Sequence, residues 1–314
     1  MERKIMKMGP SSLVVSLPSE FIKKYNIKKG DEISMMKAGD SLVLKTDKEA
    51  SLGGCSIDIS DFNPIIMRVL GVLYKAGYDE ISVTYDPEEK AFNNEKYREL
   101  DLIQKCTDLY SGMGLASLKK EKAVLKETSK IDPSEFDNVL SHAFFNLHQL
   151  SEEIAGSVMR NDFSTSKEVE LMEKLLNQNT NFCLRMISKK AYSDFPKIPD
   201  LHLIIVNLEQ IGDLFISLYR KAAKADIRAG LIEVVEELSA LVSSFQRLHQ
   251  RFDRAELVGF AKRSLKLNSR IIDLAEKNGR RGEAEMNLIL FSINTKLYDL
   301  IEPLIALNHE KIAE

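Results

Sequence analysis

The sequence has few of the residues and patterns from which disulfide scaffolds, metal fingers and membrane spans are built. Its 314 residues include only three cysteines, Cys55, Cys106 and Cys183, which lie far apart without a C-x-x-C pair. This usage indicates reduced thiols and argues against a disulfide scaffold or a zinc finger. No apolar run reaches the roughly 18–20 residues that span a bilayer, and no charged-then-apolar leader precedes the first predicted strand. We therefore expect a cytoplasmic protein without membrane insertion.

Catalytic patterns are missing as well. The five histidines are scattered, and no H-E-x-x-H or E-x-x-H pattern occurs, so zincin-type and ferritin-type metal enzymes lose their main support. Gly53-Gly54 lacks the Lys-Ser/Thr that completes a phosphate-binding loop, and Ser11-Ser12 is not followed by a nucleophile-elbow pattern. We expect a protein that is not an enzyme.

Charge is distributed unevenly along a chain that is otherwise of ordinary globular composition, with 44% hydrophobic and 29% charged residues. Residues 1–29 hold seven basic and two acidic residues, a net charge of +5, although the whole chain carries −3. The remaining residues therefore carry −8. This asymmetry suggests a small basic domain that binds an anionic partner and is joined to an acidic body. In a dimer the basic ends would total about +10, enough for salt-dependent contacts with phosphates.

The first 46 residues contain a pattern of short strands around one short helix. Two β runs precede a helix of about one or two turns, and two more follow the Gly30-Asp31 and Gly39-Asp40 turns. A unit of this length is too short to bury a core alone, so we expect it to complete its sheet with a second copy.

The stretch from Lys7 to Leu44 closely resembles the AbrB/SpoVT-type swapped-hairpin DNA-binding domain. The resemblance implies a dimeric β-barrel that binds double-stranded DNA through its first strand and the Gly-Pro-Ser-Ser loop. Short hydroxyls suit phosphate contacts there, and the basic side chains could reach base edges or the narrow groove. The candidate DNA-binding residues are Arg3, Lys4, Lys7, Ser11, Ser12 and Ser16.

Two features of this module leave alternatives open. Ser16 stands where the antitoxin members often carry a basic residue, and the Val14–Pro18 stretch looks instead like archaeal proteins that fuse this module to a PhoU-like body. The lysines around the short helix, at positions 23, 24, 28 and 29, could equally form a solvated face.

Beyond a polar joint at 47–55, the pattern predicts two further parts. Residues 47–131 alternate between helix and strand, which favours a small α/β segment, with helices at 64–75 and 94–110 and strands at 56–60, 81–85 and 123–125. Residues 132–314 read as six long helices in two sets of three, a duplicated three-helix bundle. The six helices are expected at 132–159, 166–190, 199–225, 230–251, 254–278 and 282–311. The expected fold class is thus mixed and multi-domain, with parts at 1–46, 47–131 and 132–314.

The expected helix at 199–225 has an apolar core stripe and an acidic line beside it. The stripe recurs at spacings of three and four, through Leu201, Ile204, Leu208, Ile211, Phe215 and Leu218. Glu209 and Asp213 lie about 100–140° around the helix from that stripe. As like charges four residues apart, they destabilise the helix mildly unless a cation neutralises them. They form either a solvated acidic stripe or part of a cation site.

The segment Leu208–Asp213 resembles the E-x-x-x-D helix signature of PhoU-type proteins, in which a duplicated three-helix bundle carries acidic metal-binding clusters. The layout of residues 132–314 resembles that family too. The resemblance implies metal-ligand roles for Glu209 and Asp213, and by a poorer motif match for Glu170 and Asp299. The implied cofactor is a divalent or ferric metal ion.

Together the two resemblances imply an archaeal-type phosphate uptake regulator. Such a protein would be a transcription factor that binds DNA as a homodimer or higher homo-oligomer and senses state through a PhoU-like body. The main alternative is a PhoU-type modulator of a phosphate transporter or its signalling kinase, in which the N-terminal module only dimerises and the partner is a phosphate-signalling protein. A third interpretation, a metal-dependent helical-bundle enzyme, lacks histidine ligands and an enclosed acidic core.

Overall fold

The fold is described from a computed structural model. It covers residues 2–38, 41–46, 53–93, 95–129, 132–189, 192, 194–225, 227–277 and 281–313. The expected polar joint falls largely at 47–52, outside these residues. The chain divides into two compact units, an N-terminal unit (residues 1–54) and a C-terminal unit (residues 55–314).

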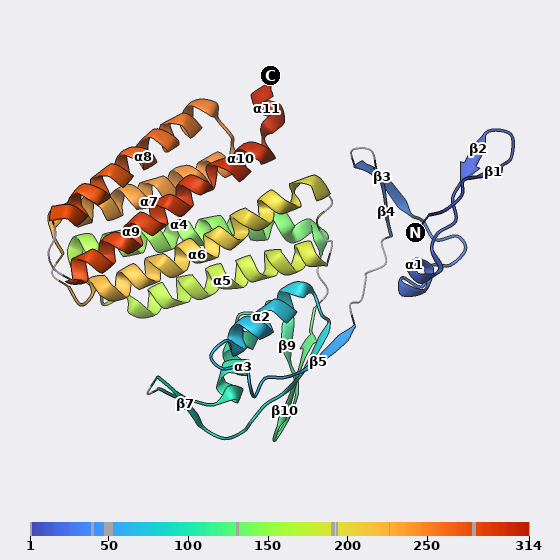
Figure 1. The fold of residues 1–314 in the computed structure, drawn as a ribbon, viewed down its shortest axis with the longest axis horizontal. Helices are drawn as coiled ribbons and strands as arrows, with labels where there is room; N and C mark the ends of the chain where they lie inside the picture. Colours follow the sequence, from blue (N-terminus) through green and yellow to red (C-terminus); the bar gives the residue numbers. More distant parts are fainter. Residues whose placement is uncertain are drawn as a thin grey trace. The chain divides into compact units, whose positions relative to one another are not determined.

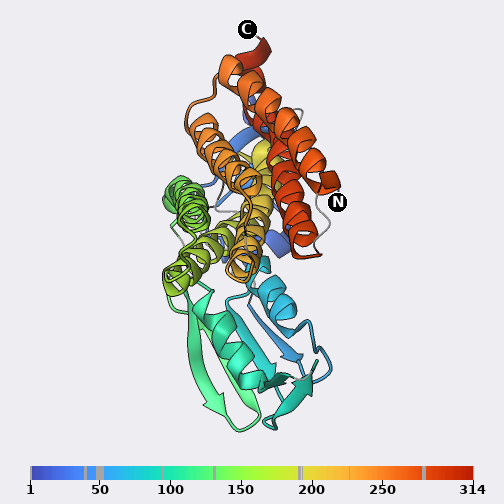
Figure 2. The ribbon, with the colours of Figure 1, turned by 90° about the vertical axis from the view of Figure 1, so that its left-hand side faces the viewer.

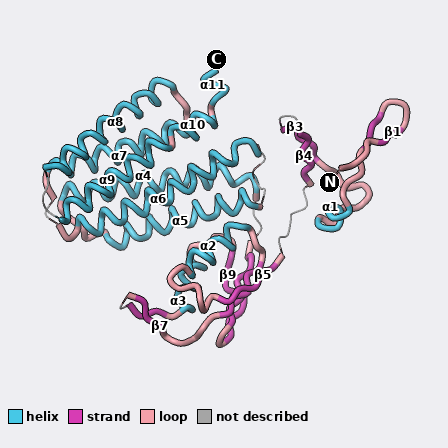
Figure 3. The backbone as a smooth tube through the Cα atoms, in the orientation of Figure 1, coloured by secondary structure: helices cyan, strands magenta, loops and turns pink. Residues whose placement is uncertain are grey.

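The described residues of the N-terminal unit form two hairpins and one short helix, which confirms the expected order of strands (Figure 3). Its elements are β1 (Met6–Met8), β2 (Ser12–Val14), α1 (Ser19–Lys24), β3 (Ser34–Ala38) and β4 (Ser41–Lys45). Strand β1 pairs with β2 and β3 pairs with β4, and the two hairpins are separate two-stranded sheets. No described residue before position 47 is buried. One chain therefore forms no closed barrel among these residues, and the barrel of the predicted dimer stays a prediction.

The C-terminal unit begins with an α/β part built on a four-stranded sheet of order β5-β6-β10-β9. Its main elements are β5 (Gly54–Asp58), α2 (Ile66–Ala76), β6 (Glu80–Thr84), α3 (Glu99–Asp108), β9 (Met113–Lys119) and β10 (Lys122–Glu127). Strand β10 runs antiparallel to both of its neighbours. The two helices cover the sheet, and together they enclose a core of their own that includes Leu70, Tyr74, Ile81 and Leu125 (Figure 2).

The rest of the C-terminal unit is a helical body whose long helices lie side by side (Figure 1). After the short 3-10 turn η1 (Pro133–Glu135) come α4 (Phe136–Arg160) and α5 (Ser166–Ser188). After a second turn, η2 (Phe195–Lys197), come α6 (Ile198–Ala222), α7 (Ala229–Gln250), α8 (Arg254–Lys277), α9 (Arg281–Asp299), α10 (Ile301–Leu307) and α11 (His309–Ala313). One continuous apolar core runs through both sets of three helices, from Phe136 to Leu304. The predicted duplication is therefore not a pair of separately packed bundles.

Helix α6 lies at the centre of this body. It packs against α4, α5 and α9, and all six residues of the predicted core stripe are buried, as the spacing predicts. Among the described residues it is the one helix long and apolar enough to cross a membrane by length and composition, with a mean hydropathy of 1.4 over its best window. Because 56% of that window is buried inside the protein, its apolar residues are accounted for as core.

Three local predictions differ from the structure. The helix expected at 94–110 begins only at Glu99, because a small hairpin, β7 (Lys90–Phe92) with β8 (Glu95–Tyr97), precedes it. Strand β9 was not expected, since its sequence is mixed and only its pairing with β10 makes it a strand. The helix expected at 282–311 is broken into three, at Leu300 and at Asn308. The first break occurs because Pro303 cannot donate a backbone hydrogen bond to the preceding turn.

A polar contact joins α2 and the sheet to α5. Arg185 on α5 is fully buried, donates to the carbonyl oxygens of Tyr74 (2.7 Å) and Tyr78 (3.0 Å), and bonds the Glu127 carboxylate at 3.1 Å. Its guanidinium also lies over the Tyr74 ring, 4.9 Å from the centroid. One turn later, Lys189 bonds Glu127 at 2.7 Å. These contacts fasten the α/β part to the helical body.

Candidate nucleic-acid interface

The β1–β2 hairpin carries the central residues predicted to contact DNA. Its register pairs Lys7 with Leu13 and Met8 with Ser12, so the turn runs through Gly9, Pro10 and Ser11. Gly9 adopts a φ of +77°, a left-handed conformation that residues with a side chain rarely adopt. The Gly-Pro-Ser-Ser sequence therefore makes a tight turn, with Ser11 in the turn itself and Ser12 as the first residue of β2.

The predicted contact residues are all exposed, namely Arg3, Lys4, Lys7, Ser11, Ser12 and Ser16. Cross-strand pairs share a face of a sheet and neighbours along a strand alternate, so Lys7 and Leu13 project from one face. Met6, Met8 and Ser12 project from the other. The basic side chains thus follow the edge strand that enters the turn, and the hydroxyls follow the turn itself.

Both faces of this hairpin also expose large apolar side chains. Leu13 is 71% exposed and Met8 is 67% exposed. The second hairpin exposes large apolar side chains on one face, where Met35 and Leu42 are more than half exposed. Exposed apolar residues on this scale are unusual for a folded monomer and mark surfaces that another molecule covers. The N-terminal unit by itself therefore leaves apolar surface uncovered.

The acidic line of α6 lies near basic side chains of α2. Glu209 is half-buried, and burial raises the pKa of its carboxyl, while the positive charges of Lys75 and Arg68 on α2 act in the opposite direction. The pKa of Asp213 is raised in the same way, again by burial first and against the effect of Arg68. Glu209 is half-buried, Asp213 is exposed, and the α/β part supplies basic side chains near both, so the solvated stripe and the cation site both stay predictions.

A third carboxylate belongs to this group and was missed from the sequence. Burial and then the charge of Asp213 raise the pKa of Glu173 on α5, with a smaller contribution from Glu170. Glu170 is exposed, and no described contact joins Asp299 to these residues. Glu173 lies three residues after Glu170, close to one helical turn, and this spacing in the sequence could have indicated that it belongs to the group.

Among the residues that the structure describes, these carboxylates are not gathered into a metal site. The described part of the chain contains no group of three or more His, Cys, Asp or Glu side chains placed to hold one. The positive charges beside Glu209 and Asp213 come from Lys75, Arg68 and Arg220. Such neighbours neutralise carboxylates without a metal and repel a cation. The metal-ligand roles of Glu170, Glu209, Asp213 and Asp299 thus remain a prediction from resemblance.

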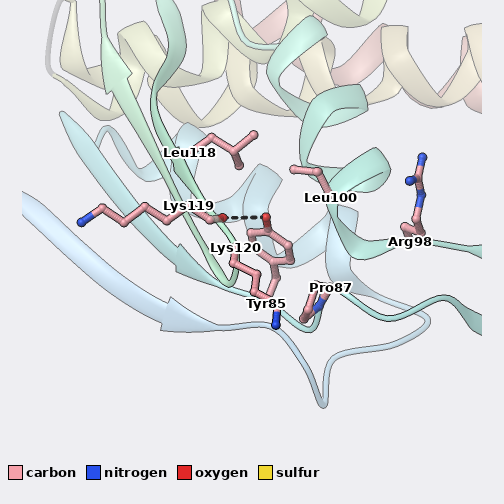
Figure 4. Close-up of a pocket in the computed structure, with 7 residues that line it drawn as sticks. All are labelled: Tyr85, Pro87, Arg98, Leu100, Leu118, Lys119 and Lys120. Atoms are coloured by element: carbon pink, nitrogen blue, oxygen red, sulfur yellow. Dashed lines mark hydrogen bonds between the residues drawn. The ribbon is translucent and has the colours of Figure 1, made fainter.

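A shallow pocket of about 420 Å³ lies in the α/β part and is lined by Tyr85, Pro87, Arg98, Leu100, Leu118, Lys119 and Lys120. Figure 4 shows Lys119 and Arg98 on opposite sides of it, with their charged ends pointing away from each other. The Tyr85 hydroxyl is engaged with the Lys119 carbonyl oxygen at 3.0 Å, and Arg98 is held by Asp101 at 3.1 Å. Because these polar groups either point apart or are already hydrogen-bonded within the protein, we assign no ligand to this pocket.

Comparison with known families agrees with the geometry of the N-terminal unit. The model of the MazE family, described as antidote-toxin recognition MazE, a bacterial antitoxin, matches residues 6–51. No curated protein matches the chain, and no solved structure matches it. The N-terminus thus carries a MazE/AbrB-type domain, as the resemblance of residues 7–44 predicts. The likeness of the helical body to PhoU-type proteins lies outside this match and stays a prediction.

Proposed function

We propose that this protein is a DNA-binding transcriptional regulator that acts as a dimer through its N-terminal unit. The observation that carries the proposal is the MazE/AbrB-type match over residues 6–51, placed on a hairpin whose basic and hydroxyl residues are all exposed. The proposal assigns the chain no catalytic role.

Dimerisation follows from what the N-terminal unit leaves uncovered. Its two hairpins are separate sheets, and each exposes apolar side chains that include Leu13, Met8 and Leu42. Burying one such side chain contributes about 1.5–3 kcal/mol, so covering several of them is a strong drive for association. A second copy, with hairpins of the same spacing, can pair with these edges and complete one small barrel.

DNA contact follows from the charge that the dimer would present. Arg3, Lys4 and Lys7 lead into the turn that carries Ser11 and Ser12. Lysine and arginine contribute affinity for phosphates by releasing counterions, and serine hydroxyls near a backbone position the protein on it. With Ser16 in place of a basic residue, binding depends on the three residues at the start of the chain.

The helical body is proposed as the part that senses a regulatory signal or binds a regulatory partner. Phosphate uptake as the regulated process rests on the PhoU-type resemblance alone, as does a phosphate-signalling protein as a partner. In the alternative, the body modulates a transporter or its signalling kinase and the N-terminal unit serves dimerisation only.

A salt titration separates DNA binding from this alternative. Binding of the full chain to a labelled mixed-sequence duplex would be followed by fluorescence polarisation at several salt concentrations. If each copy of Lys7 contacts one phosphate, Lys7→Ala removes two contacts from the dimer and lowers the slope of log affinity against log salt by about 1.8. Arg3→Ala would weaken binding at every salt concentration.

The matched control is Lys120→Ala, which removes an exposed lysine from the α/β part. This variant should bind DNA as the unmodified chain does. The DNA-binding proposal is refuted if the chain does not bind DNA at low salt. It is also refuted if Arg3→Ala and Lys7→Ala change the affinity no more than Lys120→Ala does. Either result would favour the partner-modulating alternative. Genome-wide mapping of bound DNA would then test whether phosphate genes are the targets.

A further inference from the structure

Helix α8 has an apolar stripe that no described residue of the C-terminal unit covers. Val258, Leu265 and Ile272 are 51%, 52% and 47% exposed. At 100° and 1.5 Å per residue, they lie within about 40° of one another over about 21 Å of helix. A repeat of seven residues is the spacing at which helices pack side by side in left-handed supercoils. Isolated exposed apolar residues are ordinary, but a heptad row on one face is a packing surface.

Helix α9 extends this surface. The two helices meet through Asn294, which lies 3.0 Å from the Ser264 hydroxyl and 2.6 Å from the Asn268 side chain. Helix geometry places the α8 stripe about 80° from this contact, on its solvent side. On α9, three further exposed apolar residues lie on the solvent side of the same contact, about 40–120° from Asn294. They are Leu288, Phe291 and Tyr298. We call these six residues the α8–α9 face.

Opposite charges stand at the two ends of the α8 stripe. Arg254 lies four residues before Val258, and Glu276 lies four residues after Ile272, so both project along nearly the same line as the stripe. Both side chains are exposed, and neither forms an ion pair with another described residue. The stripe is therefore basic at one end and acidic at the other, and the exposed Lys262 lies beside its apolar residues.

We propose that the α8–α9 face binds the same face of a second copy of this chain, with the two α8 helices antiparallel. A two-fold axis through Leu265 then sets Val258 against Ile272 of the partner subunit. It also sets Arg254 against Glu276 of the partner subunit at both ends. A parallel arrangement would instead place Arg254 against its own copy, which is repulsive. A two-fold contact of this kind needs one self-complementary patch, and the charge pattern provides it.

This contact goes beyond the proposed function, because it involves no residue of the N-terminal unit and does not depend on DNA. It predicts that the chain associates at a second surface. The proposal can therefore fail while DNA binding stands, and the reverse also holds.

Disulfide trapping in the full chain tests the geometry. In Leu265→Cys the two introduced thiols would face each other across the axis, so mild oxidation should yield a covalent dimer on a non-reducing gel. The control is Leu171→Cys on α5, which is 58% exposed and lies outside the α8–α9 face. Val258→Cys alone should not link, whereas Val258→Cys combined with Ile272→Cys should. A Leu265→Cys variant that links no faster than Leu171→Cys, or a Val258→Cys variant that links by itself, would overturn the antiparallel contact.

A charge exchange provides a second, independent readout. In the Leu265→Cys background, Arg254→Glu places like charges at both ends of the contact and should slow linking about tenfold. Adding Glu276→Arg restores opposite charges and should restore the rate. Circular dichroism confirms that each variant keeps its helices. If the exchanged double variant links as slowly as Arg254→Glu, Arg254 does not pair with Glu276 of the partner subunit, and the proposal is wrong.

Discussion

Replacing Arg185 by methionine should strongly destabilise the C-terminal unit, because this residue joins its two cores. The guanidinium is 1% exposed and bonds two carbonyl oxygens at the end of α2 as well as the Glu127 carboxylate. Methionine fills a similar volume but donates no hydrogen bond. The carbonyl oxygen of Tyr74 keeps its bond from the Gly77 amide, whereas that of Tyr78 loses the charged donor it has here.

The magnitude can be estimated from these contacts. A hydrogen bond to a charged group contributes about 1.5–3 kcal/mol, and breaking a buried ion pair costs about 3–5 kcal/mol. Lys189 still pairs with Glu127 at 2.7 Å and limits the loss on that side. We expect the free energy of unfolding to fall by about 3–4 kcal/mol.

Urea unfolding followed by circular dichroism measures this loss, and amide hydrogen exchange shows where it acts. Exchange in α2 and β10 should rise more than exchange in α6, since α6 lies in the other core. A double-mutant cycle with Glu127→Gln should give a coupling of about 1–3 kcal/mol. If Arg185→Met costs less than about 1 kcal/mol, or if exchange rises evenly over the unit, Arg185 does not connect the two cores as argued.

Further predictions concern packing and pH. Gly212→Ala should destabilise the protein by about 1–3 kcal/mol, because the added methyl group would collide with the buried Leu176 side chain. Gly259→Ala on α8 meets open space and should stabilise the protein by about 0.5–1 kcal/mol. Urea unfolding of this matched pair checks the sign of both changes. Burial lowers the pKa of His249, which stacks on Phe144, from 6.5 to about 4. The neutral ring is thus favoured in the folded state, so stability is complete above pH 6.5 and falls by about 2–3 kcal/mol as pH drops toward 4. Comparison with His249→Phe across this range isolates the effect, and equal pH dependence of both proteins would contradict it.

Much of the local structure could be predicted because its signals lie within a few residues. The turn residues around Gly9 and Gly30 separate the short strands of the N-terminal unit, and Gly77 ends α2 in the left-handed conformation expected of a helix end. The core stripe of α6 is complete because burial follows helical periodicity. Asp132 caps the turn before α4 by accepting hydrogen bonds from Ser134.

Contacts between distant segments could not be predicted from these signals. Strand β9 has a mixed sequence and exists through pairing with β10, and Glu173 lies near Asp213 only because α5 packs on α6. The helical pattern around Pro303 reads as continuous in the sequence, but the helix breaks at Leu300, between α9 and α10.

The periodicity, turn residues and charge asymmetry of the chain are properties of neighbouring residues, and they suffice to indicate a basic β-rich unit ahead of an acidic helical body. Which surfaces remain uncovered depends instead on how the elements pack. Val258, Leu265 and Ile272 resemble core residues in the sequence, and only the packed body leaves them half exposed. Arg185 resembles a surface residue of a polar helix, and only the docking of α2 on α5 buries it. Burial is a property of the whole fold, and for these residues it reverses what the side chain alone suggests.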